Sequence, residues 1–162
     1  MSIRQAVDPR ELRNALGAFP TGVTAIAALV DGKPVGLAAN SFTSVSLDPA
    51  IVSVCIAHSS TTWPTLRIAQ RLGVSVLGAH QERACRQLSA RDGDRFASLD
   101  WRKTDDGAVL LSGTSAWLDT SIEQEIAAGD HSIVLLRVHA FGIDSEITPL
   151  VFHGSRFRRL QV

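Results

Sequence analysis

Residues 38–49, AANSFTSVSLDP, alternate strand-forming apolar side chains with small polar ones. The apolar positions Phe42, Val45 and Leu47 are interleaved with an asparagine and several serine and threonine residues. A second hydroxyl-rich run, HSSTTWP (58–64), also comes directly after an apolar segment. Alternation predicts a β-strand, and two polar clusters at corresponding strand ends suggest that a polar ligand lies between them.

Two interpretations of these clusters are open from the residues alone. Hydroxyls and free N–H groups at strand ends suit a phosphate or a ribityl chain, because each hydrogen bond to a charged oxygen contributes about 1.5–3 kcal/mol. The run at 59–64 also leads into an expected helix, whose first N–H groups favour an anion. The pattern equally fits an edge strand with solvated hydroxyls and an ordinary Thr62 helix cap, and spacing alone favours this second interpretation.

Strands joined by hairpin turns dominate the rest of the chain. DGKP (31–34) and AAGD (127–130) predict hairpin turns. Residues 131–143 are apolar enough to be expected as a strand buried on both faces, whereas residues 91–101 are expected to be mostly loop. Short links and few long crossovers favour a mainly β, antiparallel barrel with short helices. The other expected strands are 22–30, 35–47, 51–58, 73–78 and 115–126.

Three short helices are expected between these strands. Asp8 caps the first, and Leu16 and Phe19 fall on its apolar face. The other two are expected at 62–72 and 80–90. No linker, repeat or low-complexity tract divides the sequence, so we expect a single domain over residues 1–162.

The composition limits the class of protein. A chain of 162 residues that is 45% hydrophobic fits one core that buries roughly 70% of the unfolded surface. Lys+Arg and Asp+Glu are both 16, so the net charge is 16 − 16 = 0, which argues against nucleic acid or an anionic membrane as a partner. No run approaches the ~20 apolar residues of a membrane span, and the first residues lack a signal core. Cys55 and Cys85 are therefore expected as reduced thiols in a cytoplasmic protein.

Common catalytic motifs are absent from the sequence. There is no G-x-G-x-x-G, P-loop, H-E-x-x-H or G-x-S-x-G, and the five histidines lack metal-ligand spacing. We therefore expect no metal site, and the chemistry of an enzyme would come from a bound organic cofactor. On position alone, His131 fits a solvated turn residue better than a ligand contact, Cys55 fits an inert strand residue, and Arg95 fits a solvated side chain.

Six motifs in this order resemble the short-chain flavin reductases, the reductase partners of two-component flavin monooxygenases. The similarity runs from about residue 12 to residue 160. One departure is the Leu88-Ser89 pair, where the family often has Phe-Ala. The motifs are LRNALGAFPTGVT, GLAANSFTSVSLDP, VSVCIAHSSTTWPTL, GVSVLGAHQE, RDGDRFA and IAAGDHSIVLLRV.

The resemblance implies a fold, an activity and a set of contacts. The fold is an FMN-binding split barrel, a six-stranded antiparallel Greek-key barrel that forms a homodimer with flavin near the interface. The activity is reduction of FMN or FAD by NADH or NADPH, and it supplies a separate monooxygenase. His131 is implied to lie close to the nicotinamide. The implied flavin contacts are Asn40, Ser41, Phe42, Thr43, Ser44, Cys55, Ala57, Ser60, Thr61 and Arg95.

Two other functions remain open beside this one. The first is a flavoprotein of the same barrel that retains its flavin and reduces another acceptor. The second is a flavin-binding module without catalysis. Retention of flavin distinguishes the first alternative, and failure to oxidise the nicotinamide distinguishes the second.

Overall fold

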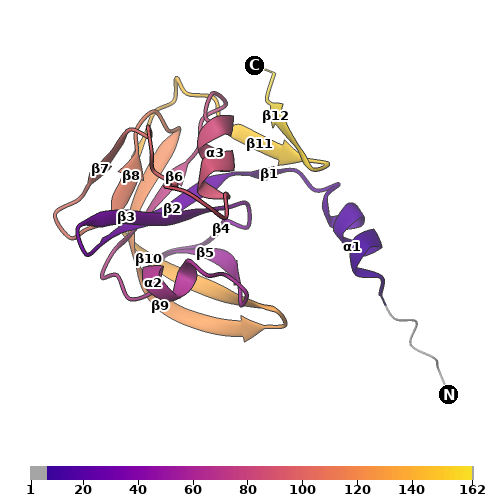
Figure 1. Cartoon of the computed structure of the whole chain (residues 1–162), viewed down its shortest axis with the longest axis horizontal. Helices are drawn as coiled ribbons and strands as arrows, with labels where there is room; N and C mark the ends of the chain where they lie inside the picture. Colours follow the sequence, from indigo (N-terminus) through magenta and orange to yellow (C-terminus); the bar gives the residue numbers. More distant parts are fainter. Residues whose placement is uncertain (1–6, 162) are drawn as a thin grey trace.

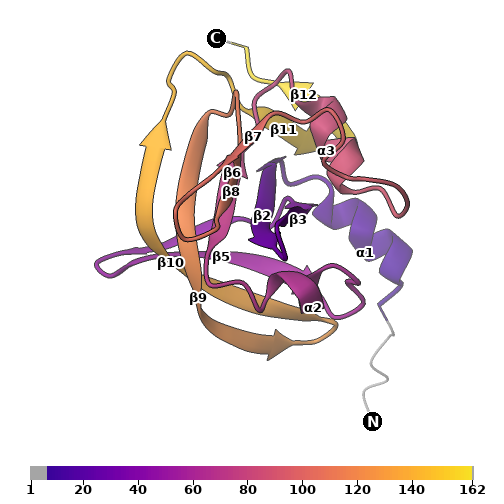
Figure 2. The ribbon, with the colours of Figure 1, turned by 60° about the vertical axis from the view of Figure 1, so that its left-hand side comes forward.

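Most strands of the protein pair in one antiparallel sheet. The computed structural model describes residues 7–161, and it places seven strands in the order β3-β2-β6-β9-β10-β5-β4. The sheet curls, so that β3 at one edge contacts β5 near the other edge (Figures 1 and 2). These strands are β2 (Thr24–Val30), β3 (Lys33–Ala39), β4 (Thr43–Leu47), β5 (Ala50–Ala57), β6 (Leu72–Val76), β9 (Ala116–Ala128) and β10 (His131–Ile143).

The hairpin turns follow the chemistry of their residues. β2 and β3 are joined through Asp31 and Gly32, whose φ angles of 50° and 77° are those of a tight two-residue turn. β9 and β10 are joined through Gly129, at a φ of 67°, and together they form a long curved hairpin (Figure 2). Both predicted turns and the prediction of a mainly β antiparallel barrel are confirmed. The main sheet has seven strands, one more than the resemblance implies.

Two smaller sheets complete the β structure. β1 (Thr21–Gly22), β11 (Leu150–His153) and β12 (Arg156–Arg159) form one, and β7 (Trp101–Lys103) pairs with β8 (Val109–Leu111) in the other. The expectation of loop up to residue 101 did not anticipate β7, because three residues are too few for a periodic pattern.

Close packing of β8 on the main sheet depends on a glycine of β6. A Cβ atom at Gly73 would lie only 2.0 Å from the Val109 carbonyl oxygen. Only glycine therefore allows the two backbones to approach this closely.

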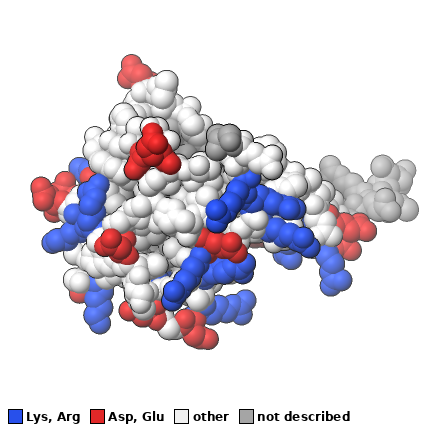
Figure 3. Space-filling model, turned by 90° about the horizontal axis from the view of Figure 1, so that it is seen from above, with Lys and Arg blue, Asp and Glu red and all other residues white. Residues whose placement is uncertain are grey.

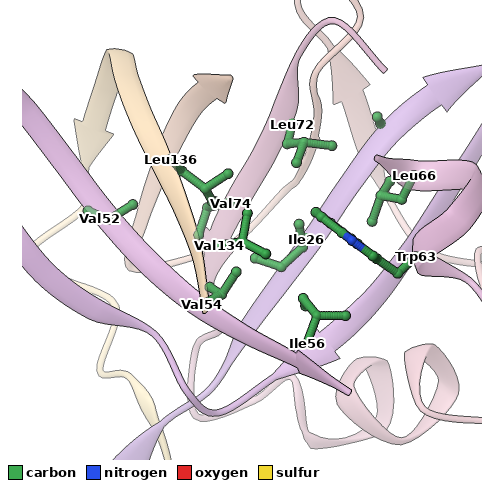
Figure 4. Packing of buried hydrophobic residues seen from close by; sticks show 11 residues of the cluster. Ile26, Val52, Val54, Ile56, Trp63, Leu66, Leu72, Val74, Val134 and Leu136 are labelled. Atoms are coloured by element: carbon green, nitrogen blue, oxygen red, sulfur yellow. The ribbon is translucent and has the colours of Figure 1, made fainter. Parts of the chain in front are cut away.

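Two hydrophobic clusters lie against the main sheet, and β2 contributes to both. Ile26 and Ala28 belong to the first cluster, whereas Ala25 and Ala27 belong to the second. This alternation shows that β2 is buried on both faces. Figure 4 shows the first cluster, in which Trp63 lies among aliphatic side chains of several strands.

The expectation that residues 131–143 are buried on both faces was wrong. Val134 and Leu136 of β10 are buried, but Phe141 is 72% exposed and Ile143 is 79% exposed. β10 runs beyond the end of β5, with which it pairs only as far as Arg137. The apolar composition of the segment therefore does not reflect burial within one chain.

The three helices within residues 7–161 differ in how they pack. In α1 (Pro9–Leu16), the Asp8 carboxylate accepts a hydrogen bond of 2.8 Å from the backbone N–H of Arg10, which confirms the predicted cap. None of the residues of α1 is buried, and the helix stands at the margin of the molecule (Figure 1). α3 (Glu82–Leu88), by contrast, buries Ala84, Cys85 and Leu88.

α2 (Trp63–Leu66) is a single turn, much shorter than the predicted helix at 62–72. Its Trp63 indole donates a 2.7 Å hydrogen bond to Glu125 of β9, and Arg67 forms an ion pair with the same carboxylate. These contacts attach the start of α2 to the β9–β10 hairpin. Burial of Trp63 and Leu66 in the core then stabilises a turn too short to be helical by itself.

The surface carries both signs of charge. Acidic and basic side chains are interspersed on the face shown in Figure 3, in line with the net charge of zero. No helix within residues 7–161 has the length and apolar character needed to cross a membrane.

Candidate functional site

A cleft of about 770 Å³ opens where the ends of β3 and β5 face each other. Its volume lies within the range of about 300–1,000 Å³ typical of small-molecule sites. Apolar side chains form part of the wall, and hydroxyls and two arginines form the rest. The lining residues are Leu37, Ala38, Ala39, Asn40, Ser41, Cys55, Ile56, Ala57, Ser59, Ser60, Thr61, Thr62, Leu88, Ser89, Arg91, Arg95 and His131.

The cleft brings together most of the residues singled out in the sequence. Phe42 instead packs against the first hydrophobic cluster, and Thr43 and Ser44 continue into the exposed edge strand β4. Their roles toward a ligand remain predictions, as do those of the residues that line the cleft. The predicted residues in the cleft are Asn40, Ser41, Cys55, Ala57, Ser60, Thr61, Arg95 and His131.

Ser41 joins the two strands that form the cleft. Its hydroxyl donates to the Cys55 carbonyl oxygen at 3.1 Å and accepts from the Cys55 N–H at 2.9 Å. The hydroxyl hydrogen is therefore used within the protein. β3 and β5 are not neighbours in the main sheet, so this pair of bonds replaces ladder hydrogen bonds at the point where the barrel closes.

The second hydroxyl run is arranged differently. The Ser60 hydroxyl accepts a 3.1 Å hydrogen bond from the Trp63 N–H, which leaves its own hydrogen available to a ligand. Thr62 likewise accepts a 2.9 Å hydrogen bond from Arg95. Thr61 is exposed and lines the cleft. This segment therefore keeps hydroxyl donors for a group inside the cleft.

Arg95 connects three segments around the cleft. Its Nε donates to the Ala90 carbonyl oxygen at 2.8 Å, and its Nη1 donates to Gly36 at 3.0 Å and to Thr62 at 2.9 Å. The guanidinium thus holds the loop after α3 against β3 and the start of α2. Its positive charge stays at the cleft wall, where a phosphate would be favoured.

Arg91 also lines the cleft and did not enter the predicted set of site residues. The signal for it was present, because Arg91 stands four residues before Arg95 in the motif RDGDRF. Which of several neighbouring arginines faces a cavity depends on the path of the loop. The hydrogen bonds of Arg95, Gln87 and Asp94 hold that path, and it could not be predicted from spacing.

His131 begins β10 and pairs in register with Ala57 of β5. Its Nδ1 lies 2.7 Å from Oδ1 of Asp130. This hydrogen bond to His131 lowers the pKa of the Asp130 carboxyl. Because Nδ1 is engaged by Asp130, Nε2 is the ring nitrogen left to contact a molecule in the cleft.

The potential metal ligands of the described residues are scattered. Among residues 7–161, no group of three or more His, Cys, Asp or Glu side chains is placed to hold a metal ion. Cys55 and Cys85 are both free thiols. The donor set fits a different kind of ligand, a flat apolar ring system with a polar chain and a phosphate. The fold and the site together define an antiparallel β-barrel protein with a cleft of small-molecule size.

Comparison with known proteins narrows this class to one family. Residues 16–161 match the family model described as "Flavin reductase like domain". A flavin reductase of Pseudomonas putida is 40% identical over 152 residues, which cover 93% of this chain and 89% of the relative. The reductase subunit HsaB of a flavin-dependent monooxygenase from Rhodococcus jostii is 36% identical, over 97% of this chain and 80% of the relative.

A solved structure agrees with the sequence relatives. The Streptomyces globisporus NADH:FAD oxidoreductase SgcE6, in complex with NAD and FAD fragments, has a TM-score of 0.89 and 37% identity, with 97% of each chain covered. Some relatives are longer, and the chain spans only 44% of a probable flavin reductase from Rhizobium meliloti. The chain belongs to the flavin reductase family, which makes it an oxidoreductase of that class.

Proposed function

We propose that the protein binds FMN or FAD in the cleft and reduces it with NADH or NADPH. The observation that carries this proposal is the convergence of Asn40, Ser60, Thr61, Arg95 and His131 on one cleft of suitable volume. When bound, the flavin supplies the hydride acceptor, so the protein needs no nucleophile of its own. Family membership supports the same activity.

Each part of the cleft has a proposed task toward the bound nucleotides. The hydroxyls of Ser60 and Thr61 donate to the flavin phosphate, with the charge of Arg95 behind them. Asn40 and the backbone beside it lie along the ring system. His131, held through Nδ1 by Asp130, positions the nicotinamide and is not assigned as an acid. The contribution of the protein is therefore orientation of two rings.

We also propose that the reduced flavin is delivered to a separate monooxygenase. The relative HsaB, a reductase subunit of a flavin-dependent monooxygenase, supports this role. A protein that delivers flavin must release it, and micromolar binding, about −8 kcal/mol, permits release. Neutral hydroxyls supply much of the polar wall, which is consistent with such an affinity.

A homodimer is the proposed assembly. Leu16 of α1 is 65% exposed and Phe19 is 75% exposed, and Phe141 and Ile143 at the end of β10 are also exposed. Exposed apolar side chains that form a contiguous patch mark protein–protein interfaces, and we propose these residues as the contact between two copies of the chain. Light scattering should give twice the chain mass, and a monomer at micromolar concentration would contradict this assembly.

The free thiols support the cytoplasm as the proposed location.

The test of the activity is NADH oxidation by the purified protein, without oxygen, with and without added FMN or FAD. We expect the visible band of the flavin to bleach rapidly, in dependence on added flavin, and desalting to remove the flavin. Tight, stoichiometric retention would instead favour a flavoprotein acting on another acceptor. Flavin binding without bleaching would favour the non-catalytic module.

A further inference from the structure

A second hollow, of about 310 Å³, adjoins the cleft. The two share Ala38, Ala39, Asn40 and Ser89 as lining residues. Beyond this shared wall, the hollow is enclosed by α3 and by the hairpin of β11 and β12. Its remaining lining residues are Val23, Cys85, Arg86, Phe152 and Phe157.

The chemistry of this hollow suits a flat aromatic ring. The Phe152 and Phe157 rings are tilted by 59° with centroids 5.5 Å apart, and both are only partly buried. The Arg86 guanidinium carbon lies 5.1 Å from the Phe157 ring centroid. Aromatic faces and a guanidinium plane are the surfaces on which nucleic-acid bases stack. Asn40 at the shared wall offers both a donor and an acceptor to the edge of a base.

Charge distinguishes the hollow from a second phosphate site. Arg86 is paired with Glu82 at 2.8 Å, so much of its positive charge is already balanced. Burial raises the pKa of the Cys85 thiol, which therefore stays uncharged at neutral pH. The hollow is thus close to neutral and favours an uncharged ring, whereas Arg91 and Arg95 place positive charge in the adjoining cleft.

We propose that this hollow is a subsite for the adenine ring of a dinucleotide whose other half occupies the cleft. The proposal rests on the proposed function, and it extends it by separating dinucleotides from mononucleotides. The required adenine is carried by FAD and by the nicotinamide dinucleotides NADH and NADPH, of which NADH is the one tested. If the ring belongs to FAD, the protein prefers FAD to FMN. If it belongs to NADH, the protein prefers NADH to reduced nicotinamide mononucleotide.

The experiment compares wild type with Phe157→Ala and Arg86→Ala. Fluorescence titration gives the Kd for FAD and for FMN, and steady-state kinetics gives the KM for NADH and for reduced nicotinamide mononucleotide. For one of the two dinucleotides, we expect the Kd or KM to rise about tenfold in Phe157→Ala and about fivefold in Arg86→Ala. The corresponding mononucleotide should be unaffected. Arg83→Ala is the matched control, because Arg83 is an exposed residue of α3 that does not line the hollow.

The outcomes separate this subsite from the proposed function itself. A selective loss of FAD affinity would assign the subsite to the adenine of FAD. A selective rise in the KM for NADH would assign the subsite to the adenine of NADH. The subsite would be overturned if Arg86→Ala and Phe157→Ala left the affinity for both dinucleotides unchanged. If FMN were still bound and reduced normally, the proposed reductase activity would be unaffected by that result. Equal losses for mononucleotides and dinucleotides would also overturn it. Absence of flavin binding in wild type would contradict the proposed function instead.

Discussion

Two segments that meet at the cleft both carry hydroxyls in the sequence but use them differently: residues 37–44 at the end of β3 (the β3 wall) and residues 55–62 from the end of β5 to the start of α2 (the β5 wall). On the β3 wall, the hydroxyl hydrogen of Ser41 is donated to the Cys55 carbonyl oxygen of β5. On the β5 wall, Ser60 and Thr62 accept hydrogen bonds, from Trp63 and Arg95 respectively. The hydroxyl hydrogen of the first wall is therefore used in joining β3 to β5, whereas Ser60 and Thr62 of the second wall act as acceptors in these bonds, which leaves their hydroxyl hydrogens for the proposed ligand. Similar composition does not imply a similar role.

The path of the chain explains this difference. Beyond Ser41, the β3 wall continues into β4, where Thr43 pairs with Ser53 and the strand forms the edge of the sheet. Beyond Ala57, the chain leaves the sheet and turns into α2, so its hydroxyls gather at the mouth of the cleft. A segment that leaves the sheet has backbone N–H and C=O groups outside the ladder, whereas a segment that enters a new strand has them paired.

The largest expected effect comes from removing the hydroxyls of the β5 wall. The double substitution Ser60→Ala/Thr61→Ala should raise the Kd for FMN about 100-fold, because each lost bond to a charged oxygen contributes at least about 1.5 kcal/mol. Riboflavin, which lacks the phosphate, should be affected much less. The comparison variant Thr43→Ala/Ser44→Ala removes two other predicted contacts; because these residues lie in the exposed strand β4 and do not line the cleft, its Kd should stay within about twofold of wild type. Equal losses in both double variants, measured by fluorescence titration, would remove the distinction between the walls.

Ser41→Ala should lower stability rather than ligand affinity. The part-buried Cys55 N–H loses its acceptor, and an unsatisfied group of this kind costs about 1–3 kcal/mol. The midpoint of urea unfolding should fall accordingly, while Ser44→Ala in the exposed strand β4 should leave it unchanged. A Ser41→Ala protein of normal stability that fails to bind flavin would show that Ser41 is a ligand contact.

His131→Ala tests the residue assigned to the nicotinamide, which lies at the start of β10 beside Ala57 of β5. The KM for NADH should rise about tenfold with the KM for flavin nearly constant, because an interaction with one substrate is lost. Asp130→Asn should give a smaller change in the same direction, since it weakens only the bond that orients the ring. A parallel rise in both KM values would contradict the assignment.

The smallest effect concerns stability in acid. The folded pKa of Asp130 is lowered below its ordinary value of 3.8, chiefly by the hydrogen bond to His131. The contribution of this carboxylate to stability is therefore present above pH 3.8 and is lost as the pH falls through the folded pKa. Unfolding of Asp130→Asn between pH 6 and pH 3 should depend slightly less on pH than unfolding of wild type. A steeper pH dependence of stability in Asp130→Asn would contradict the lowered pKa of Asp130. The effect is small because the side chain is exposed.

Local patterns in the sequence predicted most strands of the main sheet, the two hairpin turns and the helix cap at Asp8. They did not predict β7 and β8, the break that divides the expected strand 35–47 into β3 and β4, the brevity of α2 or the exposure of the end of β10. Each of these depends on what lies against the segment. Phe141 and Ile143 have the composition of a buried strand, yet no part of the described chain covers them.

The sequence by itself determined the class of fold, the family and the segments that supply the cleft. Alternation, turn residues and motif order are properties of neighbouring residues, and they survive without coordinates. Only the tertiary structure decided that Ser41 closes the barrel, that Arg91 and Arg95 both line the cleft, and that Phe42 joins the core. These roles depend on contacts between residues far apart in the chain, such as Arg95 with Gly36. A hydroxyl or guanidinium makes few hydrogen bonds at once, so the contacts made within the fold decide what remains for a ligand.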